Sequence, residues 1–309
     1  MPPLPERPPT KKGSYTTPNG DVTLLLGDCR NILPDMEGGS VDAVVTDPPY
    51  EIGFDANAWD KTGIAFTPQT WWRVLWALKP GGYMLAFGGT RTYHRMTCAV
   101  EDAGFEICDC IMWLHSMGFA IHSSRLKPSY EPIILARKPH KSATPLNIDE
   151  CRIPFASDED LAEFIATRRA INGDGGKAHK NAIRMNASPT QSADKALQNS
   201  KLGRYPTNAG HDGSEESTQG LAKGASRYFY CAKANPTERS NNYHPTVKPI
   251  ELMQWLVALV CPVGKICLDP FMGSGTTGVA CMNLARRFIG IEQNDEYYEI
   301  CKGRISAKS

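Results

Sequence analysis

The chain has 309 residues, of which 41% are apolar and 22% are charged. This composition is ordinary for a globular protein, and the length allows one large α/β domain with a smaller insert. The formal net charge of +1 excludes a uniformly basic surface, so a nucleic-acid partner would have to be met by a local patch. No apolar run approaches the roughly 18 residues that a membrane-spanning helix needs, so we expect no membrane partner.

The ten cysteines are scattered along the chain, and no Cys-x-x-Cys pair occurs. This pattern is typical of reduced core residues in a cytosolic protein, and it predicts no metal site. The first residues, MPPLPERPPTKKG, lack the apolar core of a signal peptide. We therefore expect residues 1–20 to form a flexible Pro-rich tail.

Short apolar runs alternate with segments of helical periodicity along most of the chain. Strands are expected at 22–26, 41–46, 83–87, 105–114, 132–136, 228–232, 265–269 and 287–292. Helices are expected at 68–78, 92–103, 158–171, 250–260, 276–284 and 294–306. This alternation predicts an α/β fold with a mainly parallel sheet covered on both faces.

Residues 141–225 differ from the rest of the chain because they are polar, rich in Gly, Asn and Ser, and weakly periodic. Basic residues concentrate there with few acids between them: Arg168, Arg169, Lys177, Lys180, Arg184, Lys195, Lys201 and Arg204. The composition fits a solvated, partly disordered insert, and it also fits a surface that binds phosphates. The expected organisation is one domain in two halves, 21–140 and 226–309, with 141–225 inserted between them.

The strand at 41–46 runs directly into the sequence Thr46-Asp-Pro-Pro-Tyr50. Proline has no backbone N–H, so it cannot continue the ladder of a sheet, and the strand must stop at Asp47. Two fixed φ angles at Pro48 and Pro49 make the following turn stiff. Such a turn can present the Asp47 carboxylate and the Tyr50 ring to one flat ligand, although a strand-ending turn with a capping Asp remains the alternative.

The second motif, LDPFMGSGTTG at 268–278, lies between a predicted strand and a predicted helix and contains Gly273, Gly275 and Gly278 in the spacing G-x-G-x-x-G. Glycines let the backbone approach a ligand, and a helix start offers free N–H groups. Glu292 ends the next strand, where a carboxylate can bind ribose hydroxyls. A nicotinamide dinucleotide is one candidate ligand, but Asp269 would repel its pyrophosphate, and no second glycine turn appears. S-adenosylmethionine, a nucleoside with a charged amino-acid tail, fits better.

Together, TDPPY and LDPFMGSGTT resemble the amino-methyltransferases that modify exocyclic amines of DNA bases. The motif order, with His244-Pro-Thr-Val-Lys-Pro249 between the insert and the glycine motif, is similar to that of their circularly permuted beta class. The resemblance covers about 21–140 and 226–306. It implies a Rossmann-like class I methyltransferase sheet, circularly permuted, with both motifs at its carboxyl edge and 141–225 as an inserted target-recognition region. It also implies S-adenosylmethionine as cofactor, double-stranded DNA as partner, and the cytoplasm of a bacterial or phage-infected bacterial cell.

The resemblance implies a role for each residue that matches the family's motifs. Asp47 and the Pro48 carbonyl would accept the two N–H bonds of the target amine, and Tyr50, set by Pro49, would stack on the flipped base. Lys248 resembles a residue of the family's cofactor-tail motif, although a Pro-fixed loop before a helix is the alternative. The full cofactor set is Asp28, Cys29, Asp47, His244, Lys248, Asp269, Pro270, Phe271, Gly273, Ser274, Gly275, Thr276, Thr277 and Glu292. DNA backbone contacts are expected from the basic insert, at Arg168, Arg169, Lys177, Lys180 and Arg184.

Asp in first place of the Asp-Pro-Pro-Tyr motif favours adenine N6 as the target, whereas Ser there favours cytosine N4. Both amines look alike to Asp47, so the cytosine alternative stays open. Two other classes also stay open: a nicotinamide-dependent oxidoreductase, and a DNA-binding homologue without activity. Tyr130 and Glu131 are expected near the flipped base. A homodimer and a cognate restriction endonuclease are compatible with the resemblance.

Overall fold

The computed structural model describes residues 13–53, 58–116, 126–142, 144–173, 202–218, 230–231 and 247–308. The chain divides into a larger unit, formed by 1–147, 208–219 and 231–309, and a smaller unit, formed by 148–207 and 220–230. Among the helices described, none has the length and apolar character needed to cross a bilayer.

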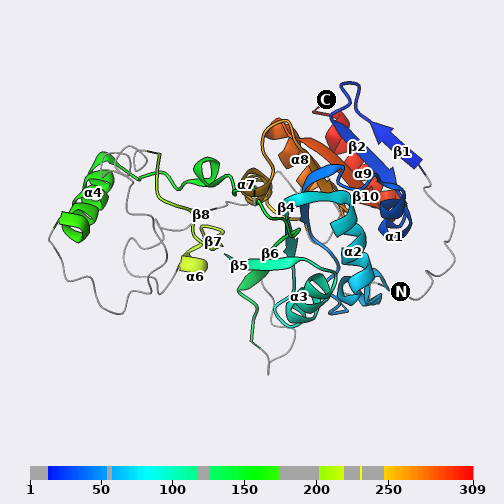
Figure 1. The fold of residues 1–309 in the computed structure, drawn as a ribbon, viewed down its shortest axis with the longest axis horizontal. Helices are drawn as coiled ribbons and strands as arrows, with labels where there is room; N and C mark the ends of the chain where they lie inside the picture. The colour runs from blue at the N-terminus through cyan, green and yellow to red at the C-terminus, as the bar shows by residue number, and fades with distance from the viewer. Residues whose placement is uncertain are drawn as a thin grey trace. The chain divides into compact units, whose positions relative to one another are not determined.

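A ten-stranded sheet forms the centre of the larger unit (Figure 1). Its order is β1-β2-β10-β9-β3-β4-β6-β5-β7-β8. The strands are β1 (Gly13–Thr16), β2 (Val22–Leu26), β3 (Val41–Thr46), β4 (Leu78–Phe87), β5 (Glu106–Leu114), β6 (Tyr130–Arg137), β7 (Ala209–His211), β8 (Tyr230–Cys231), β9 (Ile266–Asp269) and β10 (Arg287–Glu292). The run from β2 to β4 is parallel, whereas β6 pairs antiparallel with both β4 and β5.

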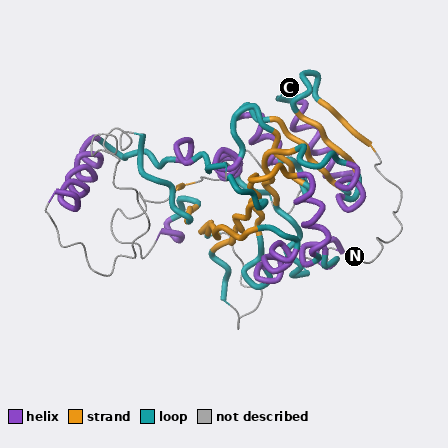
Figure 2. Tube along the Cα trace, in the orientation of Figure 1, coloured by secondary structure: helices purple, strands orange, loops and turns teal. Residues whose placement is uncertain are grey.

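Helices pack on the sheet in two groups (Figure 2). One group contains α2 and α3, and the other contains α7, α8 and α9. The helices described in the chain are α1 (Cys29–Ile32), α2 (Pro68–Ala77), α3 (Tyr93–Asp102), α4 (Asp158–Gly173), α6 (Glu215–Thr218), α7 (Ile250–Val260), α8 (Thr276–Asn283) and α9 (Asp295–Ser306). Trp71 and Val74 of α2 and Val44 of β3 are fully buried in the core between these layers.

The predicted α/β fold class is confirmed, and most predicted elements agree with the observed ones to within a few residues. Three differences have physical reasons. The β4 strand begins at Leu78 rather than Tyr83, because the chain goes straight from the end of α2 into the sheet through a register shift opposite Val41 and Ala43. The polar strand β1 carries no apolar signal, and it is added to the edge by pairing with β2. The residues of β6 do not themselves show that this strand runs antiparallel to its neighbours.

The N-terminal strand β2 lies beside the C-terminal part of the chain. It pairs in parallel with β10 from Val22 opposite Phe288 to Leu26 opposite Glu292. The Ser306 hydroxyl of α9 also donates to the Tyr15 hydroxyl of β1 at 3.0 Å. This is the arrangement that a circularly permuted sheet requires.

The smaller unit contains a buried ion pair between α4 and a later segment. Arg204 donates to Asp160 through Nη1 at 2.8 Å and Nη2 at 2.6 Å, and its guanidinium lies 4.4 Å from the centre of the Phe155 ring. Both side chains are about 6% exposed. Arg204, one of the basic residues of the insert, therefore uses its charge inside the unit.

Candidate active site

The two sequence motifs meet at one edge of the sheet. Strands β3 and β9 are parallel neighbours, with Ala43 opposite Cys267 and Val44 opposite Leu268. Their carboxyl ends therefore lie side by side, and ligands of open α/β sheets bind at this edge. A cavity of about 1250 Å³ opens there, and residues of both motifs line it.

The glycine turn after β9 depends on backbone angles that favour glycine. Gly273 and Gly275 have φ values of 50° and 81°, and a Cβ on Gly275 would lie 2.2 Å from Cys301 Sγ. Gly278 has a different reason, since a Cβ there would lie 2.8 Å from the Phe288 ring of β10. The first two glycines shape the turn, and the third lets α8 pack closely on the sheet.

Three carboxylates surround the part of the cavity next to this turn. Glu292 accepts from the backbone N–H of Gly273 at 2.9 Å and of Asn294 at 2.8 Å, which fixes its side chain at the end of β10. Asp28 caps α1 by accepting from Arg30 N at 2.8 Å, and its side chain also pairs with the Arg30 guanidinium. Burial raises the pKa of Asp269 to about 6, although Thr277 and Thr46 donate hydrogen bonds to it.

The turn after β3 is held by two carboxylates that follow it in the sequence. Glu51 has a positive φ of 56°, and its N–H donates to Asp60 Oδ1 at 2.8 Å. Glu51 Oε2 in turn accepts from Gly63 N at 2.8 Å. From the other side, the Thr92 hydroxyl donates to the carbonyl of Tyr50 at 2.7 Å. The position of Tyr50 is therefore fixed by contacts outside the motif.

A cluster of charged side chains lies at the Asp-Pro-Pro-Tyr turn. Lys248 Nζ donates to Asp47 Oδ2 at 2.7 Å and lies 3.2 Å from Glu131 Oε2. The Tyr50 hydroxyl donates to the same Glu131 oxygen at 2.5 Å. Lys248 also lies 5.4 Å from the centre of the Tyr50 ring and 4.9 Å from that of Phe87. Among the described residues, Asp47 Oδ1 has no hydrogen-bond partner although it is buried.

Burial and the neighbouring charges act against each other in this cluster. Burial raises the pKa of Asp47, and the Lys248 charge opposes that shift. For Glu131, burial acts in the same upward direction, but Lys248 and the Tyr50 hydrogen bond lower its pKa below the ordinary value. For Lys248, burial favours the neutral amine, yet Asp47 and Glu131 raise its pKa. The charged forms of Lys248 and Glu131 are therefore favoured, whereas burial shifts Asp47 toward protonation and the Lys248 charge opposes that shift.

Two cavity residues were missed by the sequence reasoning. Trp113 and His115 are at the end of β5, are 7% and 6% exposed, and line the cavity. His115 Nε2 lies 3.5 Å from Glu131 Oε1, and burial lowers the pKa of this imidazole. Neither residue belongs to a motif; their location at the end of a strand was the one available signal. Glu131, which was expected near the base, lies at the centre of the charged cluster.

Most of the predicted site residues come together around this cavity. The lining includes Asp28, Cys29, Asp47, Pro48, Pro49, Tyr50, Lys248, Asp269, Pro270, Phe271, Gly273, Ser274, Thr276, Thr277 and Glu292. Gly275 is not part of this lining, and it occupies the N-cap position of α8. Lys248 was expected at the cofactor tail, and its ammonium contacts Asp47 of the Asp-Pro-Pro-Tyr motif.

The structure does not describe the side chains of the remaining predicted site residues. His244, Lys177, Lys180 and Arg184 lie outside the described residues. Arg168 and Arg169 lie on α4, and their side chains are not described. Their DNA contacts remain a prediction. Within the described ranges, no group of three or more His, Cys, Asp or Glu is arranged around a possible metal position.

A permuted parallel sheet, with a glycine turn and an Asp-Pro-Pro-Tyr turn at adjacent strand ends, defines a class I methyltransferase fold. The sequence pattern of the N6/N4 DNA methylases matches residues 41–303. The chain therefore belongs to this family of DNA methylases, and the predicted resemblance is confirmed. It is a DNA methyltransferase rather than a nicotinamide-dependent oxidoreductase.

Similar proteins agree with this assignment. The chain is 25% identical to the type II methyltransferase M.HpaI of Haemophilus parainfluenzae over 93% of its own length and 75% of that protein. The solved M1.HpyAVI–SAM complex has 24% identity and a TM-score of 0.53, with 92% of this chain and 98% of that chain covered. The cytosine-N4-specific PvuII DNA methyltransferase has 15% identity and a TM-score of 0.59, covering 94% and 87% of the two chains. The shared fold therefore does not by itself distinguish the two target bases.

The residues around the cavity fit S-adenosylmethionine. The cavity exceeds the roughly 300–1,000 Å³ of a typical small-molecule site, which leaves room for a cofactor and a base together. Carboxylates outnumber the cations along its lining, with Asp28, Asp47, Asp60, Glu131, Asp269 and Glu292 against Arg30, Arg91, Lys127 and Lys248. This excess suits a ligand that carries a sulfonium and an ammonium. The cofactor is S-adenosylmethionine, the methyl donor of this family.

Proposed function

We propose that the chain transfers a methyl group to the exocyclic N6 amine of adenine in duplex DNA, after the base has been flipped out of the helix. The observation that carries this proposal is Asp47 Oδ1, a buried acceptor without a hydrogen-bond partner among the described residues, on a side chain that lines the cavity together with Pro48 and Tyr50. S-adenosylmethionine supplies an activated methyl group when bound, so the chain needs no covalent nucleophile.

The residues of the turn can make the weakly nucleophilic amine reactive. Asp47 Oδ1 accepts one N–H bond and the Pro48 carbonyl accepts the other, so that the nitrogen lone pair is directed out of the ring plane. The ring of Tyr50 provides a stacking surface worth about 1–3 kcal/mol, against the few kcal/mol that base flipping costs. Asp47 then accepts the proton that the amine loses. Positioning and fixed charges do most of this work.

On the cofactor side, the proposed contacts follow from the lining of the cavity. Glu292 binds the ribose hydroxyls of the cofactor, and Asp28 lies at the end of the pocket that holds the adenine of the cofactor. The turn at Gly273 and the start of α8 provide N–H groups for the carboxylate of the amino-acid tail. Cys29, Pro270, Phe271, Ser274, Thr276 and Thr277 complete the pocket.

Adenine is favoured over cytosine because Asp, not Ser, is the first residue of the Asp-Pro-Pro-Tyr motif. We further propose that the chain acts in the bacterial cytoplasm beside a cognate restriction endonuclease. The basic residues of the insert, including Arg168 and Arg169, would bind the DNA backbone. Self-association into a homodimer is part of the same proposal.

The test uses purified protein, mixed-sequence duplex DNA and S-adenosylmethionine, followed by digestion to nucleosides and mass spectrometry. We expect N6-methyladenine. The variant Asp47→Ala should give no product, while its affinity for S-adenosylhomocysteine stays within about threefold of the wild type. N4-methylcytosine would overturn the base assignment but keep the mechanism. An active Asp47→Ala enzyme would overturn the mechanism itself.

A further inference from the structure

We propose that Lys248 and Glu131 are a positioning pair: together they orient the Asp47 carboxylate and keep it a hydrogen-bond acceptor for the target amine. This inference rests on the proposed function, since it concerns how Asp47 meets the base. It assigns Lys248 a role at the target amine instead of at the cofactor tail.

The geometry of Lys248 leaves little freedom to its ammonium. The residue directly precedes Pro249, which caps α7 with φ −58°, and its side chain is 7% exposed. Its Nζ lies 2.7 Å from Asp47 Oδ2 and 3.2 Å from Glu131 Oε2. The rings of Phe87 and Tyr50 lie beside it, and the attraction of the desolvated ammonium to their faces further restricts its position.

One oxygen of Asp47 is thereby occupied and the other is left for the substrate. Oδ2 accepts from Lys248, whereas Oδ1 is without a partner among the described residues. Glu131 Oε2 contacts both Lys248 and the Tyr50 hydroxyl. The surface that stacks on the base and the acceptor that binds its amine are therefore connected through a single carboxylate.

The same pair controls the charge of Asp47. A buried carboxylate without a cation tends to take up a proton, and a protonated Asp would offer an O–H donor where the amine needs an acceptor. Lys248 opposes protonation, and Glu131 favours it. The titratable groups that bear on Asp47 come from four parts of the fold: Lys248 before α7, Glu131 on β6, Tyr50 after β3 and Asp269 on β9. His115, which directly follows β5, lies next to Glu131.

Opposite pH shifts follow for the two partners. The Asp47 carboxylate must be ionised, so the rate rises with pH through its pKa. Removing the cation in Lys248→Met raises that pKa and should move the acidic limb of the pH–rate profile upward by about one unit or more. Removing the negative charge in Glu131→Gln should move the limb downward. A purely structural role would not produce shifts of opposite sign.

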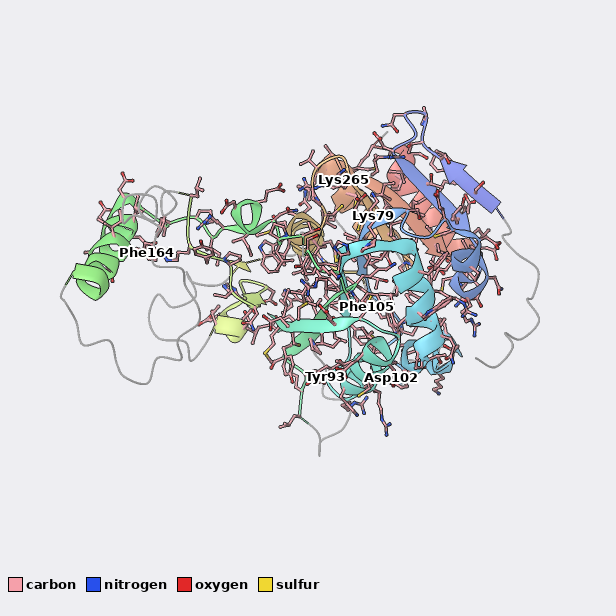
Figure 3. All side chains as sticks on the ribbon, viewed as in Figure 1. Lys79, Tyr93, Asp102, Phe105, Phe164 and Lys265 are labelled. Carbon is pink, nitrogen blue, oxygen red and sulfur yellow. The ribbon has the colours of Figure 1, made fainter. Side chains whose placement is uncertain are left out.

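The experiment measures single-turnover methyl transfer to mixed-sequence duplex DNA from pH 5 to 9, together with the affinity for S-adenosylhomocysteine. For Lys248→Met we expect a rate reduction of about 100-fold, with affinity within about threefold of wild type. Lys248→Arg should recover part of the rate. The matched control is Lys79→Met (Lys79 is labelled in Figure 3), which removes a 2.6 Å Lys–Asp pair with Asp42 at the opposite end of β3 and should leave the profile unchanged.

Three results would overturn the inference. The first is a Lys248→Met rate within about threefold of wild type, and the second is an affinity loss that matches the rate loss, which would make Lys248 a cofactor ligand. The third is a shift of the acidic limb of the pH–rate profile in the same direction in Lys248→Met and in Glu131→Gln. If Lys248→Met does not fold, Glu131→Gln alone tests the inference. A downward shift of the acidic limb of its pH–rate profile supports the inference, and the absence of that shift contradicts it. A wild type that yields no methylated base refutes the proposed function instead, and this inference with it.

Discussion

Thr46 and Asp269 are 223 residues apart in the sequence, yet the Thr46 hydroxyl donates to Asp269 Oδ1 at 2.7 Å. Each residue is the last of its strand, β3 and β9 respectively. Asp269 also accepts from Phe271 N at 3.0 Å and from the Thr277 hydroxyl at 2.6 Å. This carboxylate therefore connects the end of the catalytic strand with the glycine turn and α8.

The burial of Asp269 predicts a pH-dependent stability. Burial raises its pKa from 3.8 to about 6, so its contribution to stability is full below pH 3.8 and is lost as the pH rises to about 6. The asparagine in Asp269→Asn does not ionise, so this variant does not lose stability for this reason as the pH rises. Urea unfolding should show the variant gaining up to roughly 3 kcal/mol relative to wild type between pH 4 and 7. The exposed control Asp102→Asn (labelled in Figure 3) should show no such trend, and a pH-independent difference for Asp269→Asn would contradict the prediction.

The contact between Thr92 and the Tyr50 carbonyl predicts a kinetic effect. Thr92→Val removes this 2.7 Å hydrogen bond, which leaves the turn that carries Tyr50 less well fixed. We expect the methyl-transfer rate to fall about tenfold, with a loss of stability near 1 kcal/mol. Thr97→Val is the matched control, since the Thr97 hydroxyl makes a similar 2.8 Å bond to Tyr93 O within α3. Equal rates for the two variants would rule out the positioning role of Thr92.

The buried pair of Asp160 and Arg204 predicts that the smaller unit can be destabilised alone. Asp160→Asn leaves the Arg204 guanidinium without its charged partner and should cost roughly 3–5 kcal/mol. All six tryptophans lie in the larger unit, so circular dichroism should detect unfolding at a lower urea concentration than tryptophan fluorescence does. Asp149→Asn, which breaks the pair between the exposed Asp149 and the buried Arg152, should cost less than Asp160→Asn because one of its two partners is solvated. Coincident transitions in Asp160→Asn would refute this prediction.

The sequence predicts most of the fold because local signals agree there with tertiary packing. The prolines at 48 and 49 end β3 where expected, and Gly273 and Gly275 adopt the positive φ that their turn requires. Strand β1 could not be predicted, because its sequence GSYT has no apolar alternation and it is a strand only through its pairing with β2. The extra length of β4 likewise comes from its neighbours and not from its own residues.

The charged cluster shows why the site is harder to predict than the motifs. Lys248 belongs to a recognisable motif, but its contact with Asp47 depends on where the start of α7 lies relative to β3. Glu131 reaches the cluster because β6 runs antiparallel between β4 and β5. Asp60 holds the turn from a stretch that has no motif. Each of these contacts is set by register and strand direction, which one-dimensional spacing does not contain.

The pairing of β2 with β10 has a consequence for synthesis on the ribosome. The strand Val22–Leu26 is synthesised long before Arg287–Glu292, the strand through which it joins the parallel sheet. Asp28 and Glu292 can therefore line the same cavity only after β10 has been synthesised. A nascent chain that has not yet reached β10 lacks part of the cavity rim, so we expect it to bind the methyl donor only after this strand has joined the sheet.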